Sequence, residues 1–287
     1  MDFEPARPSV EDLYRTAEGG VRGSFGEDRA GALAYYAPLV AFVLGLRPAE
    51  GARLLDVGCG VGWSTFALAV AGYEATGIDL NPRAFEPPAH PRCVLREGSA
   101  TEIPYPADSF DVVACYQCLE HVPDPGRALD EMARVCRPGG FLAVVGPNLV
   151  SPFPGLAYLA RPSSWRNLPL RRRAGMARHP YGNTLPEILG FSLLRSAQVV
   201  AKLCRRGPGF TMREPDPTPP FHADNDACYL CNPTDLIADF RRRGFAIVRR
   251  GKPGRPPLSY LLAGGTWVAA RKRRQDEDGD ATRPGQT

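Results

Sequence analysis

The chain has 287 residues, 44% of them hydrophobic, and a formal net charge of +4. This length and composition allow one substantial core, which favours a single domain with an insertion over two domains. The most apolar stretch near the N-terminus, Tyr35 to Leu46, has 12 residues and is too short to span a bilayer. With eight cysteines and no secretory signal, we expect reduced thiols in a cytoplasmic protein.

A helix is predicted over Glu27 to Leu46, because its apolar residues fall on one helical face: Leu33, Tyr36, Leu39, Val40 and Val43. We expect residues 1–50 to form an N-terminal helical cover over a ligand cleft that the next segment creates.

The run LLDVGCGVGW, Leu54 to Trp63, is an apolar strand pattern that leads into three alternating glycines. Glycine lets backbone approach a ligand closely and tolerates positive φ. The following segment, Trp63 to Ala71, is rich in helix formers and directs its N-terminal NH groups toward the turn. The dinucleotide fingerprint requires a glycine where Trp63 stands, which argues against a nicotinamide cofactor.

Further stretches follow in a fixed order. Gly72 to Leu80 is a strand pattern ending in Asp79, whose carboxylate can accept from both ribose hydroxyls. Glu97 to Cys115 contains a loop and a buried fourth strand, and Leu119 to Asn148 a helix, a Pro-Gly-Gly turn and a fifth strand. From Arg53 to Gly146 helix and strand patterns alternate, as in a parallel sheet with right-handed crossovers.

Together these stretches resemble the class I S-adenosylmethionine-dependent methyltransferases of the type 11-like group. The resemblance implies an α/β fold with a doubly wound, mostly parallel seven-stranded sheet, a Rossmann-like methyltransferase core and an α-helical lid insertion after the fifth strand. It implies S-adenosylmethionine as cofactor. Ser99 stands where the family usually has an acid beside the adenine, with Ala100 next to it.

By the same resemblance, the cofactor contacts fall on residues at the ends of the predicted strands: Asp56, Gly58, Cys59, Gly60, Gly62, Asp79, Leu80, Ser99, Ala100, Cys115 and Gln117. In this scheme Asp56 fixes the turn by accepting nearby NH groups, and Tyr116 and Gln117 line the methionine end. The core occupies residues 51–148.

The segment 149–231 is the predicted lid. From Ser151 to Phe210 it holds ten arginines and lysines against one acid, Glu187, interleaved with apolar residues and followed by a predicted helix from Leu185 to Cys204. Basic residues beside an apolar helix suit the surface of an anionic membrane, although such a helix also packs on its own domain or on a second subunit. A nucleic-acid partner is disfavoured, because no binding module or aromatic platform accompanies the charges.

Residues 232–271 are predicted to complete the sheet, with a helix and strand in Asn232 to Gly251 and a strand in Ser259 to Arg271. Residues 272–287 are rich in charged residues and are predicted to form a disordered tail. Two CxxC pairs, Cys115 with Cys118 and Cys228 with Cys231, have zinc-ligand spacing, but their apolar surroundings favour buried thiols, and no metal is predicted.

His121 is the candidate general base, because it follows the fourth strand and imidazole titrates near neutrality. A structural role for it stays open, and His179 and His222 are alternatives. The predicted activity is methylation of a small-molecule or amphiphilic acceptor at an oxygen atom. A lipid-linked or glycan-linked acceptor is one form of this prediction. The alternatives are a nicotinamide-dependent oxidoreductase and a non-catalytic cofactor-binding scaffold. The sequence does not determine the oligomeric state.

Overall fold

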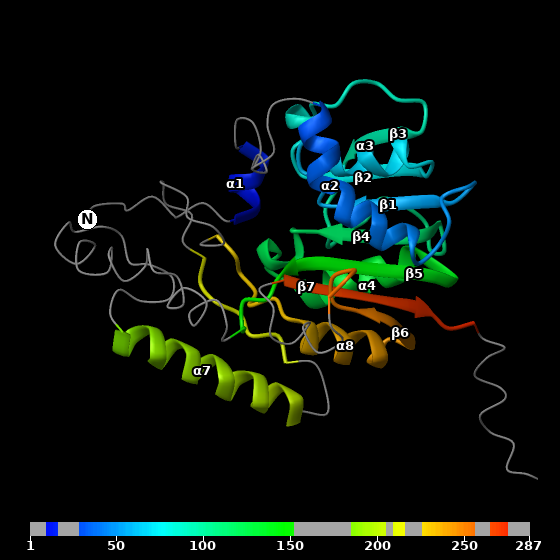
Figure 1. The fold of residues 1–287 in the computed structure, drawn as a ribbon. Helices are drawn as coiled ribbons and strands as arrows, with labels where there is room; N and C mark the ends of the chain where they lie inside the picture. Colours follow the sequence, from blue (N-terminus) through cyan, green and yellow to red (C-terminus); the bar gives the residue numbers. More distant parts are fainter. Residues whose placement is uncertain are drawn as a thin grey trace, which may run out of the picture.

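The computed structural model describes residues 10–16, 29–151, 185–204, 209–215, 226–255 and 265–274. In this part of the chain seven strands form one sheet in the order β3-β2-β1-β4-β5-β7-β6 (Figure 1). Strands β1 to β5 run parallel, and β7 pairs antiparallel with both β5 and β6. The predicted α/β fold with a mostly parallel sheet is confirmed.

The strands are β1 (Arg53–Val57), β2 (Glu74–Asp79), β3 (Cys93–Glu97), β4 (Phe110–Tyr116), β5 (Cys136–Pro147), β6 (Phe245–Arg250) and β7 (Gly265–Lys272). The central strands β1 and β4 are buried along almost their whole length, as expected when both faces of a parallel sheet are covered. The edge strand β3 is more exposed.

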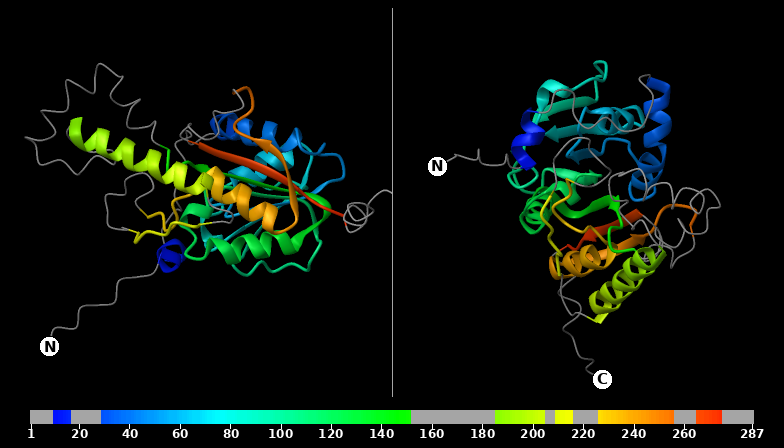
Figure 2. Two further views of the ribbon diagram at one scale, coloured as in Figure 1. Left: turned by 90° about the horizontal axis from the view of Figure 1, so that it is seen from below. Right: turned by 90° about the vertical axis from the view of Figure 1, so that its left-hand side faces the viewer.

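Helices cover both faces of the sheet (Figures 1 and 2). On one face α2 (Arg29–Leu44) and α3 (Trp63–Val70) contribute to a core that includes Phe42 and Phe66. On the other, α4 (Pro125–Val135) and α8 (Pro233–Arg242) contribute to a core that includes Met132 and Phe240. The predicted N-terminal helix is confirmed as α2, with Tyr36, Leu39 and Val43 buried.

The starts of α4 and α8 follow directly from sequence. Asp124 accepts a hydrogen bond from the Arg127 backbone NH at 2.9 Å, and Asn232 accepts one from the Asp235 NH at 3.0 Å. Each capping residue is followed by a proline at the first helical position, where the missing NH costs nothing.

The predicted alternation of helix and strand is wrong on either side of β3. Between β2 and β3 only one 3₁₀ turn forms, η1 (Pro82–Ala84), and the segment 98–109 between β3 and β4 contains no helix. Prolines explain both, because they interrupt helical hydrogen bonding and restrict the preceding residue: Pro82, Pro87, Pro88 and Pro91 in the first segment, Pro104 and Pro106 in the second.

The Pro-Gly-Gly sequence, predicted as a turn before the fifth strand, lies inside β5. The pairing of β5 with β4 shifts register there, between Phe110 opposite Cys136 and Val112 opposite Phe141. Gly139 has φ +77°, which only glycine adopts readily. The motif therefore forms a bulge that continues the strand.

The insertion between β5 and α8 is described at residues 148–151, 185–204, 209–215 and 226–232. The predicted helix is confirmed as α7 (Leu185–Cys204), which packs against α8 beside the β6–β7 edge of the sheet (Figure 2). The segments 209–215 and 226–231 pair at Met212 and Tyr229. His179, His222, all six arginines of the insertion that precede α7, and the predicted tail from residue 275 lie outside the described residues.

Candidate functional site at the carboxyl ends of the strands

The order of the strands places a topological switch between β1 and β4, where successive crossovers leave in opposite directions. In open α/β sheets ligands bind at this point, outside the carboxyl ends of the strands. The site predicted from sequence falls there.

The glycine turn joins β1 to α3, and its glycines meet different surroundings. A Cβ on Gly58 would lie 2.1 Å from the Cys118 Sγ, and one on Gly62 would lie 2.6 Å from Leu95 Cδ1. A Cβ on Gly60 would meet nothing within 4 Å, although φ there is +55°. Gly58 and Gly62 are therefore required by packing inside the protein, and Gly60 presents bare backbone to open space.

Asp56 lies beneath this turn. Its Oδ2 accepts hydrogen bonds from the Ser64 hydroxyl at 2.6 Å and the Thr65 hydroxyl at 2.8 Å. The prediction that Asp56 accepts NH groups is therefore wrong in its donors, which are hydroxyls from the first turn of α3. Burial raises the pKa of Asp56 to about 6, against the opposing effect of these two hydrogen bonds. Asp56 ties α3 to the end of β1, and Cys59 beside it is also buried.

Asp79 stands at the tip of β2, next to the open side of Gly60. Its Oδ2 accepts from the Gly60 NH at 2.8 Å and its Oδ1 from the Asn81 NH at 3.2 Å. Burial raises the pKa of Asp79, and the backbone NH groups oppose that shift. Each carboxylate oxygen has a second lone pair, so the group can also accept from a ligand diol. Leu80 follows and is half-buried.

The loop after β3 lies beside Asp79, whose carbonyl oxygen accepts from the Gly98 NH at 3.0 Å. The Ser99 hydroxyl contacts the Thr101 hydroxyl at 2.9 Å and accepts from the Thr101 NH at 3.2 Å. Ala100 packs against the core. The structure therefore brings Ser99 and Ala100 to the same end of the sheet as Asp79.

The two cofactor-binding residues predicted at the end of β4, Cys115 and Gln117, differ in exposure. Cys115 is 1% exposed and belongs to the core of the sheet. Gln117 is exposed with φ +52°, an unusual backbone conformation for a residue other than glycine, and its NH donates to the Val145 carbonyl. Sequence reasoning missed Cys118, whose side chain is the one that packs against the glycine turn.

His121 ends the short turn η2 (Leu119–His121), where α1 and the insertion meet. Its Nδ1 lies 3.3 Å from Asp226 Oδ2, and its Nε2 lies 3.8 Å from Glu120 Oε1. Tyr14, on α1 (Val10–Thr16), packs the edge of its ring against the imidazole and donates its hydroxyl hydrogen to Asp226.

The charges around His121 shift its neighbours' pKa values. Burial favours the neutral form of Asp226, but the hydrogen bond and charge of His121, with the Tyr14 hydroxyl, outweigh it and hold the Asp226 pKa at about 2. Burial, reinforced by the hydrogen bond to Asp226, raises the pKa of Tyr14. Asp226 is thus an anion held against the imidazole.

Glu120 anchors the same turn to the insertion. Its carbonyl oxygen accepts from the NH groups of Cys228 and Tyr229, at 2.8 and 3.0 Å. Its side chain is buried against Gly146 of β5, where a Cβ would come within 3.1 Å of Oε2. Tyr14 and Asp226 belong to no recognisable motif, and no sequence signal pairs them with His121. Among the described residues, no group of three or more metal-ligating side chains occurs.

The family model described as "Methyltransferase domain" matches residues 55–144, which contain the glycine turn, Asp79 and His121. The chain carries a class I S-adenosylmethionine-dependent methyltransferase domain. S-adenosylmethionine is the cofactor of this domain family, and the bare backbone at Gly60 beside a carboxylate suits an adenosine ligand.

Among curated proteins, this methyltransferase domain is similar to 27-O-demethylrifamycin SV methyltransferase of Amycolatopsis mediterranei, with 41% identity over 36% of this chain and 41% of that protein. It is similar to the ubiquinone biosynthesis O-methyltransferase of Paracidovorax citrulli, with 39% identity over 36% of this chain and 47% of that protein. The matched regions span less than half the length of these relatives.

Among solved structures, a Listeria monocytogenes protein named as a candidate S-adenosylmethionine-dependent methyltransferase is 16% identical, with a TM-score of 0.52 over 85% of this chain and all of that one. The [4+2]-cyclase SpnF is 17% identical, with a TM-score of 0.50 over 94% of this chain and 98% of that one. These likenesses concern the fold, which hosts more than one reaction.

Proposed function

We propose that this protein transfers the methyl group of S-adenosylmethionine to a hydroxyl oxygen of a small or amphiphilic acceptor. The observation that carries the proposal is the juxtaposition at one edge of the sheet of an open cofactor turn at Gly60, the Asp79 carboxylate and a histidine paired with a buried acid. The oxygen acceptor is supported by the names of the two curated relatives, one an O-methyltransferase and the other a methyltransferase of an O-demethylated rifamycin.

The residues present fit the cofactor. Asp79 would accept from the ribose hydroxyls while Gly60 and Asn81 hold its carboxylate in place. The Ser99–Ala100 loop would border the adenine, and Gly60 would let the aminoacyl end approach the backbone. Bound S-adenosylmethionine supplies a methyl group already activated by a positively charged sulfur, so the protein's remaining tasks are positioning and proton removal.

His121 is suited to take the acceptor's proton. With Nδ1–H donated to Asp226, the neutral imidazole presents Nε2 as the basic atom. A proton that arrives at Nε2 creates an imidazolium beside the Asp226 carboxylate, which stabilises the positive charge. Asp226 therefore orients the ring and also compensates its charge, and Tyr14 orients Asp226.

The test is transfer of labelled methyl from S-adenosylmethionine to hydroxylated acceptors and to a cell extract, with the product identified by NMR as a methoxy group. Asp79→Ala should weaken cofactor binding by about 10- to 100-fold, the equivalent of losing charged hydrogen bonds. His121→Asn should lower kcat with cofactor affinity retained. Labelled methyl on nitrogen would contradict the oxygen assignment, and no labelled component at all would support the non-catalytic scaffold instead.

A further inference from the structure

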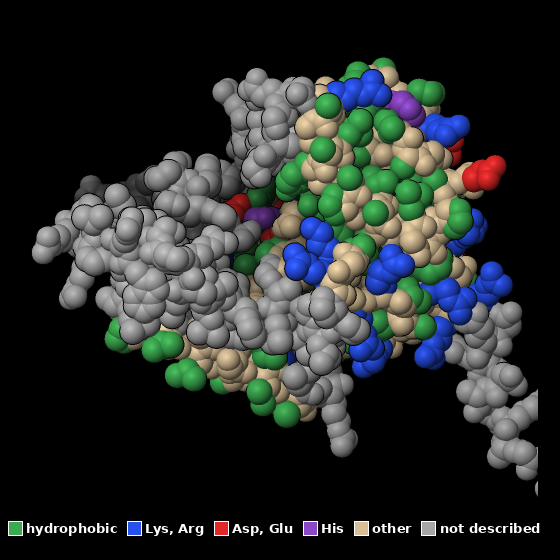
Figure 3. All heavy atoms as spheres, viewed as in Figure 1, with side chains coloured by type: hydrophobic (Ala, Val, Ile, Leu, Met, Phe, Trp, Pro, Cys, Tyr) green, Lys and Arg blue, Asp and Glu red, His purple; other side chains and the backbone are tan. Residues whose placement is uncertain are grey.

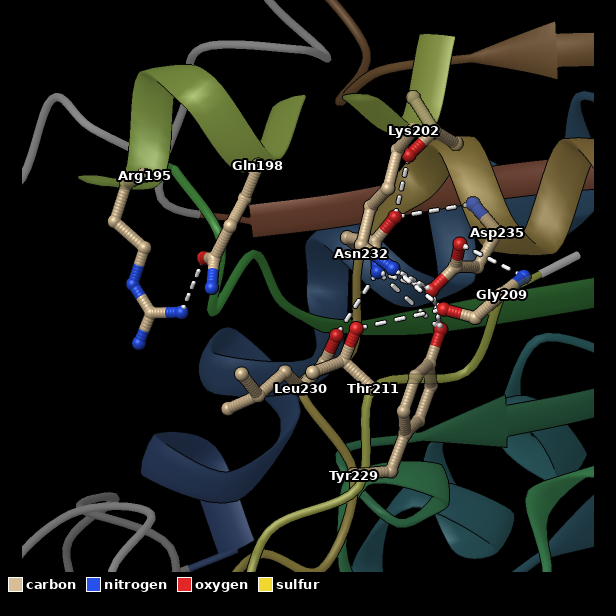
Figure 4. Close-up of polar contacts among 10 residues, drawn as sticks. Arg195, Gln198, Lys202, Gly209, Thr211, Tyr229, Leu230, Asn232 and Asp235 are labelled. Atoms are coloured by element: carbon tan, nitrogen blue, oxygen red, sulfur yellow. Dashed lines mark hydrogen bonds and ion pairs between the residues drawn. The ribbon is translucent and has the colours of Figure 1, made fainter. Parts of the chain in front are cut away.

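Helix α7 buries a charged side chain, Lys202, against the protein and leaves large apolar side chains exposed. Lys202 Nζ donates to Asp235 Oδ2 of α8 at 2.6 Å and to the Gly209 carbonyl at 2.7 Å (Figure 4). Both side chains of this ion pair are almost fully buried, at 6% and 3% exposed. A buried charge is retained only where it is paired, so this contact fixes which side of α7 points inward.

Further hydrogen bonds hold the Asp235 carboxylate in position for the ion pair with Lys202. Asn232 Nδ2 donates to Asp235 Oδ2 at 2.7 Å, and the buried Tyr229 hydroxyl donates to the same oxygen at 3.2 Å (Figure 4). Two turns before Lys202, Arg195 donates to Gln198 at 2.8 Å. Rotating α7 to bury its other side would break the ion pair and leave the buried Asp235 carboxylate without its cation.

The outward side of α7 is apolar as a result. Leu189, Leu193 and Val200 are 43%, 71% and 60% exposed, and their spacing places them on one helical face. Leu194, 59% exposed, widens this stripe, together with the small exposed residues Ala197 and Ala201. Hydrophobic side chains accordingly follow the outer side of α7 in the space-filling view (Figure 3). An apolar stripe of this kind marks an interaction surface.

The charge of the sequence on either side of α7 favours one kind of partner. Residues 151–210 carry ten arginines and lysines against the single acid Glu187, and Arg241 and Arg242 are exposed on α8, which packs against α7. Pairing two copies of the chain through α7 would bring two strongly positive segments together, which is unfavourable. An anionic surface is favoured instead, and a lipid surface offers both negative headgroups and an apolar interior.

Of the helices in the described residues, none is long and apolar enough to cross a membrane. We propose that α7 lies in the plane of an anionic bilayer, with Leu189, Leu193, Leu194 and Val200 in the acyl boundary, and that cations of the basic sequence before and after α7 bind the headgroups. This surface lies apart from the cofactor turn and goes beyond the proposed methyl transfer, on which it does not depend. It would bring an amphiphilic acceptor to the enzyme from the membrane.

The experiment is vesicle flotation of the full chain without cofactor, using phosphatidylcholine vesicles with and without phosphatidylglycerol. Wild-type protein should float with the anionic vesicles and remain unbound with the neutral ones. The double variant Leu193→Glu/Val200→Glu should lose at least about tenfold in apparent affinity, since both apolar contacts are replaced by charges that the headgroups repel. A thermal melt unchanged from wild type would show that the exposed substitutions leave the fold intact.

The matched control is Val70→Glu/Val94→Glu, which changes two valines that are each 43% exposed, at the end of α3 and on the edge strand β3. This variant should float like wild type. Absence of wild-type flotation, or equal flotation of the α7 variant, overturns the proposal. A dimer seen by light scattering that the α7 variant abolishes, without any flotation, would assign the stripe to a second copy instead.

Discussion

At the scale of single residues, the glycine turn separates requirements of packing from requirements of binding. Gly58 and Gly60 both have positive φ, at +71° and +55°, but only Gly58 faces a side chain at contact distance. Sequence spacing alone makes the glycines look equivalent. Their surroundings show that Gly60 is the one whose missing side chain leaves room outside the protein.

This difference predicts distinct behaviour for two matched substitutions. Gly60→Ala should cost about 1–2 kcal/mol of folding stability from backbone strain, yet weaken S-adenosylmethionine binding by about tenfold or more. Gly58→Ala adds a clash with Cys118 and should lose a further 1–3 kcal/mol, approximately. Urea unfolding and isothermal titration measure the two effects, and equal affinity of Gly60→Ala and wild type would show that the ligand does not approach this backbone.

Asp226 gives a prediction for pH. Its pKa falls from 3.8 to about 2 on folding, which corresponds to roughly 2 kcal/mol of stabilisation for this largely buried carboxylate. A lowered folded-state pKa stabilises the protein above the unfolded value, and that contribution is lost as the pH falls from about 4 toward about 2. Asp226→Asn should therefore be less stable than wild type near about pH 5, with the difference shrinking in acid.

Urea unfolding at several pH values measures this difference. Asp108→Asn is a suitable control, because Asp108 forms an exposed ion pair with Lys272 and should contribute little. A difference between wild type and Asp226→Asn that stays constant down to about pH 2 would contradict an ionic contact with His121.

At the scale of elements, the sequence predicts the helices and strands whose own residues determine them. The β1–turn–α3 unit and the bounds of α7 follow from periodicity and glycine spacing. The helices predicted on either side of β3 are absent, because prolines in both segments prevent helical hydrogen bonding although a parallel sheet usually has helical crossovers there. Tyr14 and Asp226 could not be predicted, since they reach His121 from positions more than a hundred residues away along the chain and only tertiary packing joins them.

The buried pair between α7 and α8 predicts how α7 is held. Lys202→Met leaves the Asp235 charge buried without its cation, which costs about 3–5 kcal/mol where both groups are desolvated. Because α7 packs mainly on α8, we expect the loss as faster amide hydrogen exchange in α7, with α4 unchanged as the internal control. Adding Asp235→Asn to Lys202→Met should recover part of the protection, and exchange that is equally fast in the double variant would contradict the role of charge.

At the scale of the whole molecule, the carboxyl edge of the sheet is assembled from distant parts of the chain. The turn and Asp79 come from the first crossover, His121 from the end of β4, Asp226 from the insertion and Tyr14 from α1. A ligand bound at this edge would contact elements that pack on both sides of the sheet. Its binding energy should therefore appear as stability of the whole domain.

The effect of ligand binding on stability distinguishes the two cofactors that the glycine turn suggests, S-adenosylmethionine and NADH. S-adenosylmethionine at about 100 times its Kd should stabilise the folded state by about 2.7 kcal/mol and raise Tm by roughly 5–10 °C. NADH should leave Tm unchanged, because Trp63 occupies the third glycine position of the dinucleotide fingerprint and is buried, with its indole NH bonded to Glu86. At the same S-adenosylmethionine concentration, Asp79→Ala should show a smaller rise in Tm than wild type, as its weaker binding requires. A rise with NADH alone would favour an oxidoreductase, and no response of the wild-type chain to either ligand would mean that the open side of Gly60 is not a cofactor site.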